Sequence, residues 1–283
     1  MRQALVLGGG GVVGVAWETG VVCGLLEHGV DLRAAEAIVG TSAGSMVGTR
    51  IAAEQDLRRP RAGVAIPAQD GGPDVATLQR VFARWGQATQ VDHDLLKEIG
   101  ALAAQARTVD ESAWIAATGG SVGVVDWPTD SLRLVAVDVA TGHLGVHDRA
   151  SGAPLERAIA ASCAVPGMFP PITIMGRRYM DGGVRSGTSA DVLLGDEPEV
   201  VLVIAPLARG TSSIGALAER CLDNEIAALR AAGARVVKVV PDAADLEAFG
   251  ANLMDPSRAA SAADAGTTRG RALAESLADV WRS

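Results

Sequence analysis

The sequence predicts an α/β fold, in which short buried strands alternate with helices. Two apolar runs of strand length, residues 4–7 and 37–39, are each followed by glycines and then by a helix-forming stretch. The chain has 283 residues, of which 48% are hydrophobic, and this is enough for one large core. We therefore expect a single domain over residues 1–283.

The first half of the chain is expected to be mostly helical outside these two strands. Helices over residues 15–27 and 45–53 follow the two glycine turns. Residues 58–73 are rich in Arg, Pro and Gly, which is typical of a loop. Capping aspartates and apolar residues at three- and four-residue steps then predict a helical insertion at about 55–120, with helices over residues 74–85, 92–105 and 111–116.

The second half alternates strands and helices. A β-hairpin over residues 131–139 and 143–147 turns at Thr141-Gly142, and a helix over 154–163 follows it. The remaining expected elements are strands over residues 172–174, 178–180, 200–205 and 236–240, a helix over 214–232, and a C-terminal helical region at about 242–283.

Residues 40–44 read Gly-Thr-Ser-Ala-Gly, the Gly-x-Ser-x-Gly pattern of a nucleophilic serine. Between a strand and a helix this pattern forms a sharp turn, because glycines on either side of the serine remove the Cβ atoms that would clash. The expected strand before the pattern and the expected helix after it supply that context. Ser42 is therefore a candidate nucleophile.

A second glycine cluster, residues 8–14, has the same place between a strand and a helix. Unpaired amides at a helix start bind anions, so the cluster fits either a phosphate or the oxyanion of a tetrahedral acyl intermediate. The spacing of Gly9, Gly11 and Gly14 matches the G-x-G-x-x-G of a dinucleotide-binding loop. That match is weak, because neither acidic candidate for the ribose, Asp31 or Glu36, ends a second strand.

Asp181 follows an expected strand and precedes two glycines, which places it at the mouth of an α/β sheet. A serine hydroxyl becomes nucleophilic when a base within hydrogen-bond distance takes its proton, and Asp181 is the candidate base. The histidines of the chain are His28, His93, His143 and His147. All of them precede Asp181, whereas the triad of an α/β-hydrolase takes its histidine from a late loop, so this rival is disfavoured.

Four motifs in this order resemble the patatin-like phospholipase family. They are the glycine cluster at 8–14, the serine pentapeptide at 40–44, the stretch Ala-Ser-Cys-Ala-Val-Pro-Gly-Met-Phe-Pro-Pro at 161–171, and the Asp-Gly-Gly at 181–183. The resemblance covers roughly residues 4–205. It implies a three-layer α/β/α fold with a mostly parallel central sheet.

The resemblance also implies a function and a set of site residues. It implies a Ser-Asp dyad that hydrolyses lipid acyl esters, with Ser42 as the nucleophile and Asp181 as its base. The backbone amides that would stabilise the oxyanion are those of Gly9, Gly10 and Gly11.

Three positions depart from the family pattern. Val13 stands where the family usually has Arg or Lys, and Gly187 and Ser189 stand where it usually has Asn and Pro. Two functions therefore stay open. One is a serine lipid acyl hydrolase of the phospholipase A, lysophospholipase or esterase type; the other is a non-catalytic or weakly active member that binds lipid or protein.

Two segments have both a structural and a functional interpretation. Residues 58–73 fit either a surface linker or the hinge of a lid over the site. Apolar residues of the helical insertion fit either an acyl-chain tunnel or ordinary core. These residues are Phe82, Trp85, Leu95, Leu96, Ile99, Leu102, Trp114 and Ile115.

Composition disfavours one class of partner. A net charge of −8 and a pI near 5.1 argue against binding of nucleic acid. The resemblance implies that the partner is a lipid or acyl ester. Cys23, Cys163 and Cys221 lack metal-ligand spacing, so we expect buried thiols and no metal or cofactor.

Glycines interrupt the first apolar run, which argues against a signal peptide. We therefore expect a cytoplasmic protein with at most peripheral membrane contact. Oligomeric state is not indicated.

Overall fold

The computed structural model describes residues 2–59, 67, 74–208 and 213–281. Within this part of the chain, eight strands form one sheet in the order β5-β6-β3-β2-β1-β7-β8, with β4 paired to β3. The strands are β1 (Gln3–Leu7), β2 (Ala37–Thr41), β3 (Leu132–Asp138), β4 (Leu144–His147), β5 (Ile172–Ile174), β6 (Arg177–Asp181), β7 (Val200–Ile204) and β8 (Arg235–Val239). The pairs among β3, β2, β1, β7 and β8 are parallel, and those made by β4, β5 and β6 are antiparallel.

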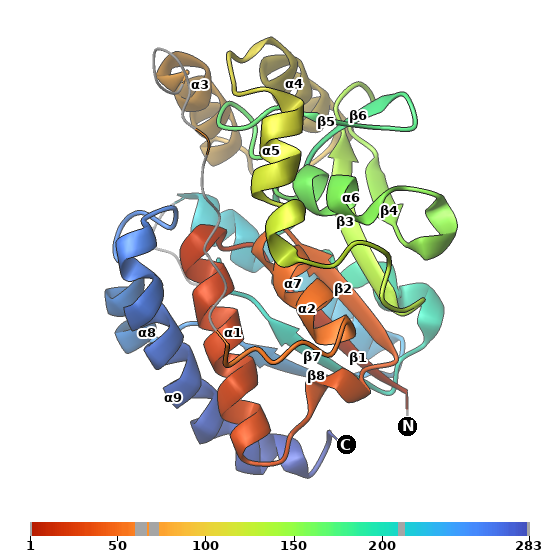
Figure 1. Cartoon of the computed structure of the whole chain (residues 1–283), viewed down its shortest axis with the longest axis vertical. Coiled ribbons are helices and arrows are strands. Elements are labelled where there is room, and N and C mark those ends of the chain that lie inside the picture. The colour runs from red at the N-terminus through yellow and green to blue at the C-terminus, as the bar shows by residue number, and fades with distance from the viewer. Residues whose placement is uncertain (1, 60–66, 68–73, 209–212, 282–283) are drawn as a thin grey trace.

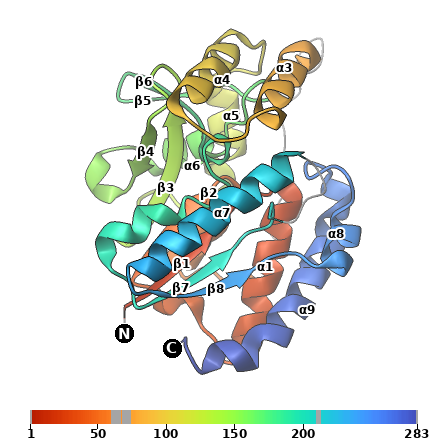
Figure 2. The same cartoon turned by 180° about the vertical axis from the view of Figure 1, so that it is seen from behind.

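Helices cover both faces of this sheet. The helices of the described residues are α1 (Gly11–Glu27), α2 (Ala43–Ala52), α3 (Val75–Gly86), α4 (His93–Gln105), α5 (Glu111–Ala117), α6 (Leu155–Ser162), α7 (Ser213–Ala231), α8 (Ala243–Phe249) and α9 (Ala259–Ala278). Figure 1 shows α1, α2 and α9 on the near face of the sheet, and Figure 2 shows α7 crossing the opposite face. The expected three-layer α/β/α fold is confirmed.

Alternating residues of the central strand face the two helical layers. Leu5 and Leu7 of β1 pack in the cluster that includes α1, α2 and α9, whereas Ala4 and Val6 pack in the cluster that includes α7. The whole strand is buried, as its apolar run predicts for a parallel strand covered on both faces.

The helical insertion between α2 and β3 consists of α3, α4 and α5. The side chains of Asp74 and Asp92 cap the first two of these helices by accepting hydrogen bonds from the backbone amides of Thr77 and Leu95. Apolar residues of α3 and α4 pack over the ends of β3 and β6 in a cluster of their own. The linker or lid hinge expected at 58–73 lies largely outside the described residues.

Helices α1 and α9 lie in backbone contact. A methyl group at Gly24 would lie 2.3 Å from the carbonyl oxygen of Thr267, and one at Gly270 would lie 2.2 Å from that of Val21. Glycine is therefore required at both positions, and the C-terminal helix is fixed against the first helix of the fold.

Both glycine turns are shorter than the sequence predicts. Helix α1 begins at Gly11 instead of residue 15, and α2 begins at Ala43 instead of residue 45. Each helix thus starts close to the carboxyl end of its strand, where the candidate site lies.

The thiols also differ from expectation. Cys23 and Cys221 are partly exposed, and of the three cysteines only Cys163 is buried.

Candidate active site

Ser42 occupies a strained turn between β2 and α2. Its φ of 52° and ψ of −117° lie in a region that residues with a side chain rarely adopt. The flanking glycines allow this turn, because a methyl group at Gly40 would lie 2.7 Å from the carbonyl oxygen of Gly44, and one at Gly44 only 2.1 Å from that of Leu7. The side chain of Ser42 stays partly exposed, as a nucleophile requires.

The hydroxyl of Ser42 donates a hydrogen bond to Asp181. Oγ lies 2.8 Å from Oδ2 of the carboxylate, which stands at the end of β6 where that strand pairs with β3. The other carboxylate oxygen, Oδ1, accepts the backbone amide of Gly183 at 2.7 Å. The fold thus brings together two residues that are 139 positions apart in the sequence.

Burial changes the acidity of Asp181. Only 4% of the residue is exposed, and desolvation raises its pKa from 3.8 to about 7, against the opposing effect of the bonds from Gly183 and Ser42. A carboxylate with a pKa near neutrality is suited to general base catalysis, because it takes a proton readily and is still ionised in part of the molecules at pH 7.

Three consecutive residues at the end of α6 hold both members of this pair. The amide of Ser42 donates to Oγ of Ser162 at 2.9 Å, and the thiol of Cys163 donates to the carbonyl oxygen of Ser42 at 3.3 Å. The carbonyl oxygen of Ala164 accepts the amide of Asp181 at 2.9 Å. These contacts were not foreseen, although the residues belong to the motif at 161–171, where small polar residues end a helix.

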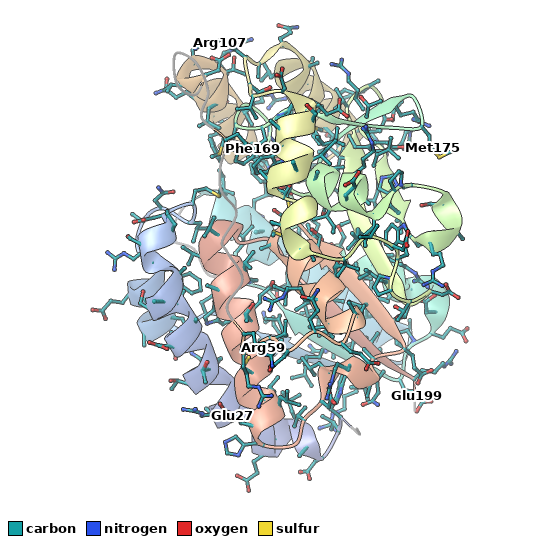
Figure 3. All side chains as sticks on the ribbon, viewed as in Figure 1. Glu27, Arg59, Arg107, Phe169, Met175 and Glu199 are labelled. Carbon is teal, nitrogen blue, oxygen red and sulfur yellow. The ribbon has the colours of Figure 1, made fainter. Side chains whose placement is uncertain are left out.

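The same motif is anchored in the core by its aromatic residue. Phe169 stacks on Trp114 of α5, with ring centroids 3.6 Å apart. Figure 3 places Phe169 beside α5 within the body of the molecule, whereas Met175, at the turn between β5 and β6, lies at its edge. The segment that holds the Ser-Asp pair is therefore also packed against α5.

The glycine loop is tied to the serine turn and to β7. The carbonyl oxygen of Gly8 accepts the amide of Gly44 at 2.9 Å, and its own amide donates to Ile204 at 2.9 Å. A methyl group at Gly9 would lie 3.5 Å from Cβ of Ser42, so the loop borders the nucleophile.

The amides of the loop differ in the hydrogen bonds that they make. The amide of Gly9 donates to the carbonyl oxygen of Gly187 at 2.8 Å, so it is engaged by the protein in this structure, and its assignment to the oxyanion hole stays a prediction. Within the described residues, the amides of Gly10 and Gly11 make no hydrogen bond to the protein. They stand at the start of α1, where amides are free to meet an anion.

No histidine of the described chain bonds to Ser42 or Asp181. His28, His93 and His143 are exposed, and the rings of the last two contact each other. His147 is buried with its ring edge on Tyr179, and burial lowers its pKa. The geometry therefore contains a serine–carboxylate pair and no Ser-His-Asp triad among these residues.

The three positions that depart from the family pattern have structural roles. Val13 is fully buried in the core, and its amide donates to Leu253 at 3.0 Å. Gly187 supplies the carbonyl oxygen that accepts the Gly9 amide, and Ser189 adopts a left-handed conformation with a φ of 51°.

The apolar residues of the insertion are mostly core. Leu95, Leu96 and Ile99 pack against β3 and β6, and Trp114 and Ile115 belong to the main core. Of the residues expected to line a tunnel, Trp85 borders a small hollow beside α7 in the described part of the structure. None of the described helices is long and apolar enough to span a bilayer.

Fold and site together define a three-layer α/β protein with a serine turn and a buried carboxylate at the carboxyl edge of its sheet. A family model described as Patatin-like phospholipase matches residues 5–194. The chain therefore belongs to the patatin-like phospholipase family. Among solved structures, it is similar to VipD from Legionella pneumophila, with 13% sequence identity and a TM-score of 0.47 over 97% of this chain and 67% of that chain.

Proposed function

We propose that this protein is a lipid acyl hydrolase in which Ser42 is the nucleophile and Asp181 its general base. The contact of 2.8 Å between Oγ and Oδ2 carries the proposal, because it is the geometry for proton transfer as Oγ attacks an ester carbonyl. Membership of the patatin-like phospholipase family supports a lipid substrate.

The proposed reaction is acyl transfer in two steps. Asp181 takes the proton of Ser42 while Oγ attacks, and the amides of Gly10 and Gly11 stabilise the oxyanion. Asp181 then gives the proton to the departing alcohol, which leaves an acyl group on Oγ. In the second step, Asp181 takes a proton from a water molecule while the water oxygen attacks the acyl carbonyl. Asp181 then returns the proton to Oγ of Ser42 as the carboxylic acid leaves. Removal of one hydrogen-bond donor to an oxyanion typically lowers kcat by on the order of a hundredfold or more.

The substrate type within this class is a carboxylic ester of the phospholipase A, lysophospholipase or simple esterase kind. The competing function, lipid or protein binding without catalysis, predicts no covalent chemistry at Ser42. The strained turn and the bonded carboxylate favour the hydrolase, because neither feature is needed for binding alone.

Labelling with a fluorophosphonate probe separates these functions. We expect wild-type protein to be labelled and to hydrolyse p-nitrophenyl esters, and Ser42→Ala to lose both properties while keeping its circular dichroism spectrum. Ser276→Ala, an exposed serine on α9, is the matched control and should behave as wild type. A folded Ser42→Ala protein that keeps more than a tenth of wild-type turnover would exclude Ser42 as the nucleophile.

A further inference from the structure

The loop over residues 185–189, the 185–189 loop, is hydrogen-bonded to both parts of the candidate site. The carbonyl oxygen of Gly187 accepts the amide of Gly9 at 2.8 Å, in the glycine loop. The next carbonyl oxygen, that of Thr188, accepts the hydroxyl of Thr41 at 3.1 Å. Thr41 ends β2 and directly precedes the nucleophile. The position of this loop therefore affects the glycine loop and the serine turn together.

The 185–189 loop has a conformation that its backbone does not favour. Ser189 has a φ of 51°, in the left-handed region that residues with a side chain rarely adopt. Proline, which the family usually has at this position, cannot adopt it, because its ring fixes φ at about −65°. The loop therefore needs hydrogen bonds to keep its shape. Oγ of Ser186 supplies two of them, by accepting the amides of Thr188 and Ser189 at 3.2 and 3.0 Å.

A buried carboxyl group on α7 supplies two more. Oε2 of Glu225 accepts the hydroxyl of Thr188 at 2.6 Å and the backbone amide of Ala190, directly after the loop, at 2.9 Å. Burial raises the pKa of this carboxyl, and the hydroxyl of Ser186 opposes that effect. Helix α7 crosses the face of the sheet opposite α1 (Figure 2), and Glu225 connects it to the candidate site.

An ion pair also closes the 185–189 loop. The guanidinium of Arg185 pairs with Asp191, and both side chains are partly exposed. Exposed ion pairs contribute little to stability, because water screens them. By contrast, the buried hydroxyl of Thr188 and the buried amide of Ala190 would lose their acceptor if Glu225 were removed. Glu225 is therefore the stronger of the two anchors.

We propose that Glu225 is a positioning residue for acyl transfer. By fixing the 185–189 loop, it holds the glycine loop and the turn of Ser42 in the geometry that the reaction needs. This inference rests on the proposed hydrolase function. Loss of the carboxyl group should lower kcat and leave KM nearly unchanged, because the oxyanion donors and the nucleophile act in the transition state.

Glu225→Leu tests this role, because leucine fills a similar volume without an acceptor. We expect kcat for p-nitrophenyl acetate to fall by roughly ten- to a hundredfold, with KM within about twofold of wild type. Glu225→Gln keeps an acceptor oxygen and should restore kcat to within about threefold of wild type. Asn224→Leu, at the exposed neighbouring position of α7, is the matched control and should behave as wild type.

Thr188 gives a second test that leaves Glu225 in place. Thr188→Val removes the hydroxyl that bonds to Glu225, whereas Thr188→Ser keeps it, so only the first should lower kcat, by about three- to tenfold. If Glu225 acts through this bond, Glu225→Leu combined with Thr188→Val should lower kcat by less than the product of the two single effects.

Folding of every variant is checked by circular dichroism before kcat and KM are measured. Folded Glu225→Leu with unchanged kcat, or with a raised KM alone, would overturn the positioning role, and so would equal losses in Glu225→Leu and Glu225→Gln. If Glu225→Leu does not fold, unchanged kcat in folded Thr188→Val overturns it instead. In each case active wild-type protein leaves the hydrolase function standing. Wild-type protein that hydrolyses no ester would contradict the proposed function, and this inference with it.

Discussion

The two faces of the sheet use small residues in opposite ways. On the α1 face, a methyl group at Gly24 would lie 2.3 Å from the backbone of α9. On the α7 face, a methyl group at Gly187 would lie 3.8 Å from its nearest neighbours, which is ordinary van der Waals contact. The first glycine allows backbones to touch, whereas the second leaves room for a methyl group. A glycine in the sequence therefore does not by itself indicate close packing of backbones.

The segment that holds the Ser-Asp pair packs on the α1 face of the sheet. Its residues Cys163 and Ala164 belong to the core on that face. We infer that this packing fixes the reacting groups.

The same substitution on each face should change the stability of the protein by different amounts. Gly24→Ala should lower the free energy of unfolding by roughly 2 kcal/mol or more, because α1 and α9 must separate, and this exceeds the helix preference for Ala. Gly187→Ala should change it by less than about 1 kcal/mol in either direction. Urea unfolding of both variants measures the contrast, with Gly195→Ala as a control in open space. Equal losses would remove the distinction between the faces.

Asp181→Asn should show how much the buried carboxylate of Asp181 lowers the free energy of unfolding. The folded-state pKa of about 7 lies above the unfolded value, so the native protein binds more protons between about pH 4 and 7 and loses stability as pH rises through that window. The variant cannot lose stability in this way. We expect it to be more stable than wild type at pH 8, by up to about 3–4 kcal/mol, and to lose this advantage at pH 4.

Thermal unfolding of both proteins across this pH range measures the difference. Because Glu18 and Glu225 are also buried carboxyls with raised pKa values, only the difference between variant and wild type isolates Asp181. A difference that does not depend on pH would mean that Asp181 is not desolvated as described.

Ser162→Ala tests whether the packed side positions the nucleophile. Loss of the acceptor for the Ser42 amide should lower kcat about tenfold with little change in KM, because the turn is needed in the transition state more than for substrate binding. Ser162→Thr keeps an acceptor oxygen and should restore most of kcat. If KM rises while kcat is unchanged, Ser162 belongs to substrate binding instead.

Much of this site is predictable from the sequence, because strand, glycine turn and helix are local patterns. The meeting of Ser42 and Asp181 is not local, because β3 lies between β2 and β6 and β6 runs antiparallel to β3, so the motifs predict the two residues but not the contact between them. The bond between Gly9 and Gly187 was not predictable, since it depends on how the loop after Asp181 folds back over the sheet. Gly24 and Gly187 likewise differ only in what the folded chain brings opposite them.

Burst kinetics with a p-nitrophenyl ester test the central claim, that a carboxylate and not an imidazole activates Ser42. The comparison is between Asp181→Asn and a protein in which His28, His93 and His143 are Ala and buried His147 is Gln, each first shown to be folded by circular dichroism. We predict that Asp181→Asn loses the burst, with kcat lower by about 10²–10⁴, while the histidine variant keeps it. A folded histidine variant without a burst, or an Asp181→Asn protein with a normal one, would contradict the account.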